Sequence, residues 1–213
     1  MATADVPARR SQANRRADSR ALILDAAVDV LVERGYHGTT TVAIQERAGI
    51  TRGRLLHHFP SRDAVLVAAA HHLASERILE MERWFARTDD PDPGGAARID
   101  SAIEHLWNTF RQPYFWAAME LWSAARTDEA LREEIAAAER RLGRAIQSVV
   151  ATMFGPVHSS HPQFDIVRDV LFTSMRGVAL TYTFVDRDPA TDTHVALWRG
   201  TARRFLLGED HDS

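Results

Sequence analysis

Residues 39–62 read TTTVAIQERAGITRGRLLHHFPSR, and this stretch decides the fold. The threonines at positions 39–41 favour the start of a short helix, because a threonine hydroxyl can accept a hydrogen bond from a free N–H group of the first turn. Gly49 allows the left-handed backbone of a turn, and Thr51 can cap a second short helix that Pro60 closes. Two short helices joined by a tight turn are typical of a helix-turn-helix motif.

The second helix of this motif has an apolar face and a polar face. Apolar residues of the motif form a small core that would fix the crossing angle of the two helices: Ile44, Ala48, Ile50 and Leu55. On the polar face, Arg52 and Arg54 can each present a guanidinium fork to a guanine or a phosphate. Gly53 between them lets the backbone approach DNA. The same face continues with His57, His58 and Arg62. We therefore expect this face to bind double-stranded DNA.

The net charge of −3 conceals two parts of opposite sign. Residues 1–62 contain ten arginines and six acidic residues, whereas residues 63–213 contain sixteen arginines and 23 acidic residues. All 26 basic residues are arginine, which excludes chemistry that depends on lysine, such as a Schiff base or a P-loop. A basic end on an acidic protein indicates a nucleic-acid contact confined to that end.

The rest of the chain also has helical periodicity. A helix begins near Asp18 or Ser19, either of which can cap it, and ends with Gly35 in the C′ position. Residues 1–18 are expected to form a flexible basic arm, whose arginines either enter a minor groove or remain in solvent. Further helices are expected at residues 61–87, 97–111, 114–126, 128–154, 163–185 and 189–207. No segment alternates as a strand does, so the predicted fold class is all-α.

Residues 19–66 resemble the N-terminal domain of the TetR/AcrR family of bacterial transcriptional regulators. The resemblance is carried by Gly35, Tyr36, the threonines at 39–41, Ile44, residues 48–53 and residues 55–62. It implies a homodimer with an all-α regulatory domain, and repression of a promoter that a small ligand relieves. The family's recognition helix corresponds to residues 51–58.

The resemblance also implies phosphate contacts, at Thr40, Thr41, His57 and Arg62. Two positions depart from the family pattern. Leu56 stands where the family most often has a phosphate-contacting tyrosine, and we expect it to be a packing residue. Gln45 stands where an alanine normally lets the two helices pack, which indicates a changed crossing or a glutamine turned to solvent. The predicted DNA-binding residues are Thr40, Thr41, Thr51, Arg52, Gly53, Arg54, His57, His58 and Arg62.

Eight of the seventeen aromatic residues lie between positions 84 and 122. This clustering on neighbouring helices predicts an apolar cavity for a flat or greasy small-molecule effector, although aromatic residues at helical spacing also serve as plain core. Nearby polar residues could anchor the ligand: His105, Asn108, Arg111, Gln112 or Glu120. The predicted ligand-binding residues are Trp84, Trp107, Phe110, Tyr114, Phe115, Trp116, Met119 and Trp122.

The last two predicted helices have more apolar residues than one core face requires. We expect them to form a homodimer interface through Phe164, Val167, Leu171, Met175, Val178, Tyr182, Val195, Trp198, Ala202 and Phe205. Gly177 and Ala179 would permit close approach of the helices. A two-fold dimer would place two recognition helices about 34–36 Å apart, as a palindromic DNA site requires.

The sequence argues against several classes of protein. Cysteine is absent and no apolar run is long enough for a membrane span, so we expect a cytoplasmic protein without membrane contact. The ten histidines do not fall at metal-ligand spacings, and no catalytic or nucleotide-binding motif is present. We therefore expect no enzymatic activity, no metal and no cofactor.

The sequence thus predicts three segments and one function. Residues 1–18 form the arm, residues 19–62 the helix-turn-helix DNA-binding domain, and residues 63–213 a helical ligand-binding and dimerisation domain. We expect a dimeric, ligand-responsive transcriptional regulator, in the first instance a repressor that a small hydrophobic or aromatic effector releases from a palindromic operator. The alternative is a helical small-molecule-binding protein without productive DNA binding.

Overall fold

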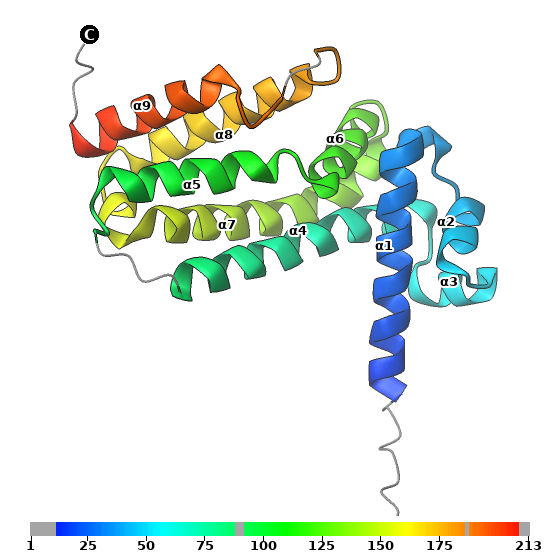
Figure 1. Cartoon of the computed structure of the whole chain (residues 1–213). Helices are drawn as coiled ribbons and strands as arrows, with labels where there is room; N and C mark the ends of the chain where they lie inside the picture. Colours follow the sequence, from blue (N-terminus) through cyan, green and yellow to red (C-terminus); the bar gives the residue numbers. More distant parts are fainter. Residues whose placement is uncertain (1–11, 88–91, 186–187, 209–213) are drawn as a thin grey trace, which may run out of the picture. The chain divides into compact units, whose positions relative to one another are not determined.

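The computed structural model describes residues 12–87, 92–185 and 188–208, and every regular element in these residues is an α-helix. The predicted all-α fold class is confirmed. The helices, labelled in Figure 1, are α1 (Gln12–Gly38), α2 (Thr41–Ala48), α3 (Arg52–His58), α4 (Arg62–Arg87), α5 (Ala96–Thr109), α6 (Pro113–Ala125), α7 (Glu129–Ser159), α8 (Phe164–Thr181) and α9 (Thr193–Leu207).

The chain forms two compact units that do not follow the linear order of the sequence. Unit 1 comprises the described residues up to His72 and residues 117–134. Unit 2 comprises residues 73–116 and the described residues from Ile135 onward. The helices α4, α6 and α7 each contribute residues to both units. A division at residue 62 therefore remains a prediction about function and does not describe how the chain packs.

Helix α1 is longer than the sequence pattern indicated. It includes Gln12, so the prediction of a flexible arm is wrong for residues 12–18, and residues 1–11 lie outside the described residues. The physical reason is local, because glutamine, alanine and arginine, which recur in this stretch, all favour helix. Ser19 is not a cap, since it lies inside the helix with a side chain that is almost fully buried.

The turns and caps of unit 1 agree with the local signals in the sequence. Gly35 has a φ of 66°, which interrupts the helical backbone of α1. The Thr40 hydroxyl accepts a hydrogen bond from the Ala43 N–H group (3.1 Å) and caps α2. Gly49 adopts the left-handed conformation after α2, and the Thr51 hydroxyl accepts from the Arg54 N–H group and caps α3. These features set the path of the chain between the two short helices (Figure 1).

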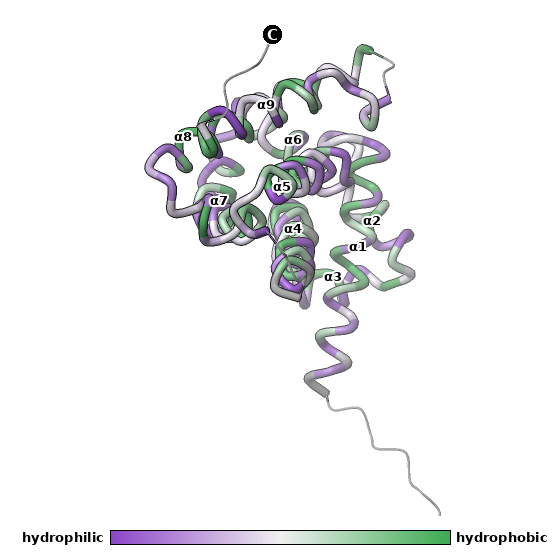
Figure 2. Tube along the Cα trace, turned by 60° about the vertical axis from the view of Figure 1, so that its left-hand side comes forward, coloured by the Kyte–Doolittle hydropathy of each residue, from purple (hydrophilic) through white to green (hydrophobic). Residues whose placement is uncertain are grey.

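Unit 2 is organised around an aromatic core. The ring centroids of Trp107 on α5 and Trp198 on α9 are 4.9 Å apart, and these two helices pack side by side (Figure 1). Both indoles are satisfied, because the Trp198 N–H group donates to the Ser174 hydroxyl and that of Trp107 to the Pro189 carbonyl. Figure 2 shows hydrophobic stretches recurring along α4, α5 and α7, interrupted by hydrophilic residues, as expected for helices with one buried face.

Three predicted helix boundaries in unit 2 are wrong. Helix α8 ends at Thr181 rather than residue 185, and the chain continues in a turn. Helix α9 begins at Thr193 rather than residue 189, because the Asp192 carboxylate accepts from the His194 N–H group and caps it there. Helix α7 extends as far as Ser159, with a break at Gly155, whose φ is 79°.

Candidate nucleic-acid interface and cavities

Helix α3 presents an exposed polar face on a buried support. Leu55 is buried beneath the helix, whereas Arg52, Arg54 and His57 are exposed. Nothing lies within 4 Å of the position that a Cβ atom on Gly53 would take, so this part of the helix is open to a close-fitting partner. Arg52 makes no hydrogen bond or ion pair with the described residues, and its guanidinium group is available to a ligand.

Helix α1 adds positive charge beside α3, which the sequence interpretation missed. Burial lowers the pKa of His58, and the neighbouring charges of His57, Arg16, Arg54 and Arg20 lower it further. Arg16 and Arg20 both belong to α1, so their influence on His58 places this part of α1 near α3. Their spacing of four residues is the signal that could have identified them, because such residues share one helix face.

Arg54 has one structural contact and is also a predicted DNA-binding residue. Its Nε–H group donates to the hydroxyl of Ser19 on α1 (2.8 Å), which ties α3 to α1. This bond uses one donor of the guanidinium group, and the terminal nitrogens remain for a base or a phosphate. The exposed side of Arg54 therefore still fits the predicted DNA contact, which stays a prediction.

Arg62 points into unit 1. Its guanidinium group donates to the backbone carbonyls of Tyr36 and Thr39, and it lies 4.1 Å from the centre of the Tyr36 ring. It also forms an ion pair with Asp63 at 3.2 Å. These contacts hold the segment between α1 and α2, so the structure gives Arg62 a supporting role that differs from the phosphate contact predicted for it.

The two departures from the family pattern have different outcomes. Leu56 was expected to be a packing residue, and this is wrong, because its side chain is 47% exposed on α3. The reason is its position next to Leu55, which takes the buried position on this short helix. Gln45 is half-buried on α2, and its carbonyl accepts a hydrogen bond from the Gly49 N–H group.

The remaining predicted DNA-binding residues lie at helix starts and ends. Thr40 and Thr51 are exposed caps, Thr41 is half-buried at the first position of α2, and His58 is half-buried at the end of α3. Their backbone N–H groups and hydroxyls are of the kind that bind phosphate at a helix N-terminus. All of these residues belong to unit 1.

The predicted ligand-binding residues do not form one group. Trp107 and Phe115 are buried in the core, Phe110 and Trp116 line a cleft, and Tyr114 lines a separate enclosed cavity. Met119 and Trp122 belong to the part of α6 in unit 1. The Trp84 side chain lies outside the described residues. Aromatic spacing alone could not separate core from cavity lining, because both use the same side chains.

The enclosed cavity lies in unit 2 and has a volume of about 40 Å³. Its walls are apolar side chains of α4, α5, α7 and α8, with Arg77, Thr109 and Tyr114 as polar members. The Tyr114 hydroxyl is buried and has no hydrogen-bond partner in the part of the chain that the structure describes. Burial raises the pKa of Tyr114 to about 12, and this effect outweighs the lowering of the pKa by the neighbouring Thr109 and Arg77. The hydroxyl is therefore neutral, and it lies in a cavity whose walls are mostly apolar.

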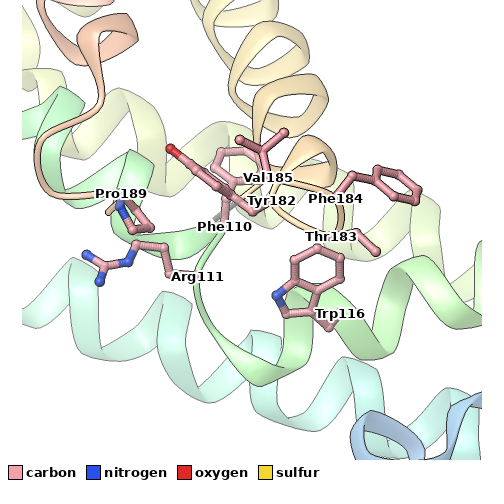
Figure 3. Close-up of a pocket in the computed structure, with 8 residues that line it drawn as sticks. All are labelled: Phe110, Arg111, Trp116, Tyr182, Thr183, Phe184, Val185 and Pro189. Atoms are coloured by element: carbon pink, nitrogen blue, oxygen red, sulfur yellow. The ribbon is translucent and has the colours of Figure 1, made fainter. Parts of the chain in front are cut away.

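An open cleft of about 500 Å³ lies elsewhere in unit 2 (Figure 3). Arg111 and Trp116 border it on one side, and the turn after α8 borders it on the other. Phe184 of that turn is 88% exposed.

Glu120, another predicted polar anchor for the ligand, has a different contact. Its carboxylate accepts a hydrogen bond from the Tyr36 N–H group within unit 1.

The predicted dimer interface needs correction. Six of its ten residues are buried within the single chain, so they form the core: Phe164, Val167, Leu171, Met175, Trp198 and Ala202. Val178, Tyr182 and Val195 are half-buried, and Phe205 is exposed. Helix α8 has apolar residues on both its buried and its exposed side. Several large apolar residues of α8, of the turn after it and of α9 are exposed and are here called the outer stripe: Ile166, Val170, Leu180, Phe184, Leu197 and Phe205.

Among the described residues, no three potential metal ligands come together. None of the described helices is long and apolar enough to cross a membrane.

Comparisons with known proteins agree with this geometry. The model of bacterial regulatory proteins of the tetR family matches residues 23–69. The HTH-type transcriptional regulator CymR of Pseudomonas putida is 33% identical over 178 residues, which cover 82% of this chain and 84% of CymR. The similarity to CymR therefore extends well beyond the helix-turn-helix.

Solved structures share the fold. Escherichia coli NemR in its reduced form has a TM-score of 0.67 at 14% identity, covering 91% of this chain and 100% of NemR. Bacillus subtilis FadR in complex with stearoyl-CoA has a TM-score of 0.61 at 16% identity, covering 89% of this chain and 98% of FadR. With the family match, the extended similarity to CymR and the helix-turn-helix of unit 1, the chain belongs to the TetR family of bacterial regulatory proteins and is a DNA-binding transcription regulator.

Proposed function

We propose that the protein is a homodimeric, ligand-responsive repressor, which binds a palindromic operator through α3 and leaves it when a small hydrophobic or aromatic effector binds unit 2. The observation that carries the DNA-binding part is the exposed cationic face of α3. Arg52 there has an available guanidinium group beside the open Gly53, and caps at both short helices hold this face in place.

Operator binding is tested with the DNA upstream of the protein's own gene. Affinity is measured by fluorescence anisotropy over a range of salt concentrations, with a scrambled fragment as competitor. We expect steep salt dependence together with sequence preference. Arg52→Ala should cost about 1–3 kcal/mol and relax the preference at one base pair per half-site. Arg126→Ala, which removes the same charge from an exposed position of unit 1, is the matched control.

A protein without sequence preference would refute the repressor and favour the alternative of a ligand-binding helical protein. Equal losses for Arg52→Ala and Arg126→Ala would show that only total charge matters, and would refute the docking of α3 in the major groove.

The outer stripe supports the homodimer. Ile166 is 68% exposed, and Val170 lies one helical turn further along α8. Leu180 on α8 and Leu197 on α9 are also exposed, and both helices belong to unit 2. Gly177 on α8 is exposed and would allow a second helix to approach closely. The partner that fits the outer stripe is a second copy of this chain, because a two-fold interface pairs the same surface of both subunits.

Light scattering at micromolar concentration tests the dimer. We expect a mass of about twice the 23.9 kDa of one chain. Val170→Asp should shift the protein to the mass of one chain, because it places an unpaired charge in an apolar interface. Val157→Asp is the control, since Val157 is as exposed as Val170 but lies on α7. A wild-type mass of one chain would refute the homodimer.

The enclosed cavity supports an effector that is mostly apolar. Apolar walls favour such a ligand, and the buried Tyr114 hydroxyl offers one hydrogen bond to an acceptor on it. The present volume would hold roughly three waters, so the cavity must widen to admit a larger molecule. Widening that favours a form unable to bind DNA is the physical basis of release. The structural neighbour FadR was solved with stearoyl-CoA, a ligand with a long apolar chain.

A panel of small apolar compounds with one hydrogen-bond acceptor tests this site. Compounds that release the operator should also raise the midpoint of thermal unfolding. Tyr114→Phe should weaken these compounds about fivefold to tenfold, and should leave operator affinity without compound unchanged. An effector that acts equally on Tyr114→Phe and on the wild type would place its site elsewhere.

A further inference from the structure

A hydrogen bond inside unit 1 connects two helices that are far apart in the sequence. The N–H group of Tyr36 donates to the Oε2 atom of Glu120 on α6, at 2.8 Å. Gly35, just before it, has φ 66° and ψ 177°, so the peptide that follows is turned out of the helical direction. A Cβ atom at position 35 would lie 3.0 Å from the same carboxylate oxygen. The glycine and the carboxylate therefore fit each other closely.

The residues after Tyr36 lead directly to the DNA-facing part of unit 1. The Thr39 hydroxyl donates to the carbonyl of Gly35 at 2.7 Å, and Thr39 is fully buried. Arg62 donates to the carbonyls of Tyr36 and Thr39. Thr40, the cap of α2, is the next residue. The segment that leads into α2 is thus held by Arg62, on the carbonyls of Tyr36 and Thr39, and by Glu120, on the N–H group of Tyr36.

We infer that Glu120 is a positioning residue for operator binding, which holds the Gly35 to Tyr36 peptide so that α2 begins where the DNA-facing helices require it. This inference rests on the proposed function. The hydrogen bond of Glu120 is to the backbone of Tyr36, so its effect on α2 passes through the backbone of residues 35–40. A hydrogen bond from a backbone N–H group to a carboxylate is stronger than one between neutral groups, which suits this role.

The same helix carries residues of both cavities. Tyr114 and Trp116 lie on the first turn of α6, and Glu120 follows four residues after Trp116. Glu120 lies six positions after Tyr114, a distance of roughly 9 Å along the helix at the usual rise. A displacement of this short helix by an effector would therefore also move the carboxylate that holds Tyr36.

Two variants and a control test the inference. Glu120→Ala removes the acceptor, Glu120→Gln keeps an acceptor but removes the charge, and Glu133→Ala removes an equal charge from an exposed site in unit 1. Loss of a negative charge normally raises affinity for DNA. We nevertheless expect Glu120→Ala to bind the upstream fragment about tenfold more weakly, while Glu120→Gln stays within threefold of the wild type and Glu133→Ala shows no loss.

Hydrogen exchange separates positioning from unfolding. The Tyr36 amide should exchange slowly in the wild type and in Glu120→Gln, and at least tenfold faster in Glu120→Ala. The amides of α3 should keep their protection in all three proteins, and titration at concentrations far above Kd should give equal active fractions.

The outcomes distinguish this inference from the proposed function. A wild type without sequence preference overturns the proposed function. A wild type that binds, with Glu120→Ala binding equally well or Glu120→Gln as weak as Glu120→Ala, overturns only the role of Glu120. Equal loss of protection throughout α3 would also overturn it, because Glu120 would then stabilise the fold rather than one peptide.

Discussion

Replacement of Gly35 by alanine tests the backbone conformation on which unit 1 depends. Gly35 combines a φ of 66° with a ψ of 177°. This region of conformational space is almost restricted to glycine, and a side chain there costs about 1–3 kcal/mol. The new Cβ atom would also lie 3.0 Å from the Oε2 atom of Glu120, so the carboxylate would have to move by a few tenths of an ångström.

Gly49 provides a matched comparison within the same unit. Its φ of 62° and ψ of 38° are left-handed helical, and nothing lies within 4 Å of the Cβ position. Alanine there should cost about 1–2 kcal/mol from the backbone alone. We expect Gly35→Ala to cost about 2–4 kcal/mol, because its backbone region is less accessible and because it disturbs the bond between Glu120 and Tyr36.

Urea unfolding followed by circular dichroism measures both variants. Combining Gly35→Ala with Glu120→Ala should cost about 0.5–1 kcal/mol less than the sum of the single changes, since the carboxylate no longer obstructs the methyl group. A cost of Gly35→Ala no greater than that of Gly49→Ala, or strict additivity of the changes at positions 35 and 120, would refute the close fit of Gly35 to Glu120.

Three further changes have distinct expected outcomes. Arg62→Ala should lower stability by about 1–3 kcal/mol and leave the salt dependence of DNA binding unchanged, whereas a slope smaller by about one would indicate a phosphate contact. Leu56→Ala should alter the free energy of unfolding by less than about 0.5 kcal/mol in urea titrations, and a loss of about 2–5 kcal/mol would indicate a buried residue. Burial raises the pKa of Asp192, but hydrogen bonds from Tyr182 and His194 lower it below its ordinary value overall. Its stabilising effect is then present above about pH 4 and is lost on acidification, so Asp192→Asn should flatten the decline in urea midpoint between about pH 5 and pH 3.

The helix-turn-helix could be predicted from sequence because short-range chemistry determines it. Thr40 and Thr51 accept from N–H groups three residues further along the chain. Gly49 closes α2 in the left-handed conformation. Each signal and its partner lie within one turn, so no tertiary contact is needed to locate these elements.

The buried face of α8 could not be predicted, because apolar residues lie on both sides of this helix. Leu171 and Met175 are fully buried, whereas Ile166 and Val170 are largely exposed. Periodicity identifies both faces but does not say which one meets α5, α7 or α9. That choice depends on how side chains from distant parts of the sequence fill the core.

The long-range contacts of unit 1 were equally inaccessible to sequence reasoning. Glu120 is 84 residues from Tyr36 along the chain, and Arg62 is 26 residues from it. Neither position has a local signal for its partner. From sequence alone, an acidic residue in an aromatic helix fits a ligand anchor, and an arginine just after α3 fits a phosphate contact. Each side chain serves a structural purpose equally well.

The arginines near α3 show why charge alone overstates a DNA interface. Arg52 is available, Arg54 gives one donor to Ser19, and Arg62 is committed to backbone carbonyls. The guanidinium fork that suits guanine also suits a pair of carbonyl oxygens, so only the partners in the fold separate these roles. Arg16 and Arg20, by contrast, add positive charge beside α3, because their place on α1 brings them near His58. The salt dependence of operator binding should therefore follow the exposed cations of α1 and α3 rather than the excess of arginine in residues 1–62.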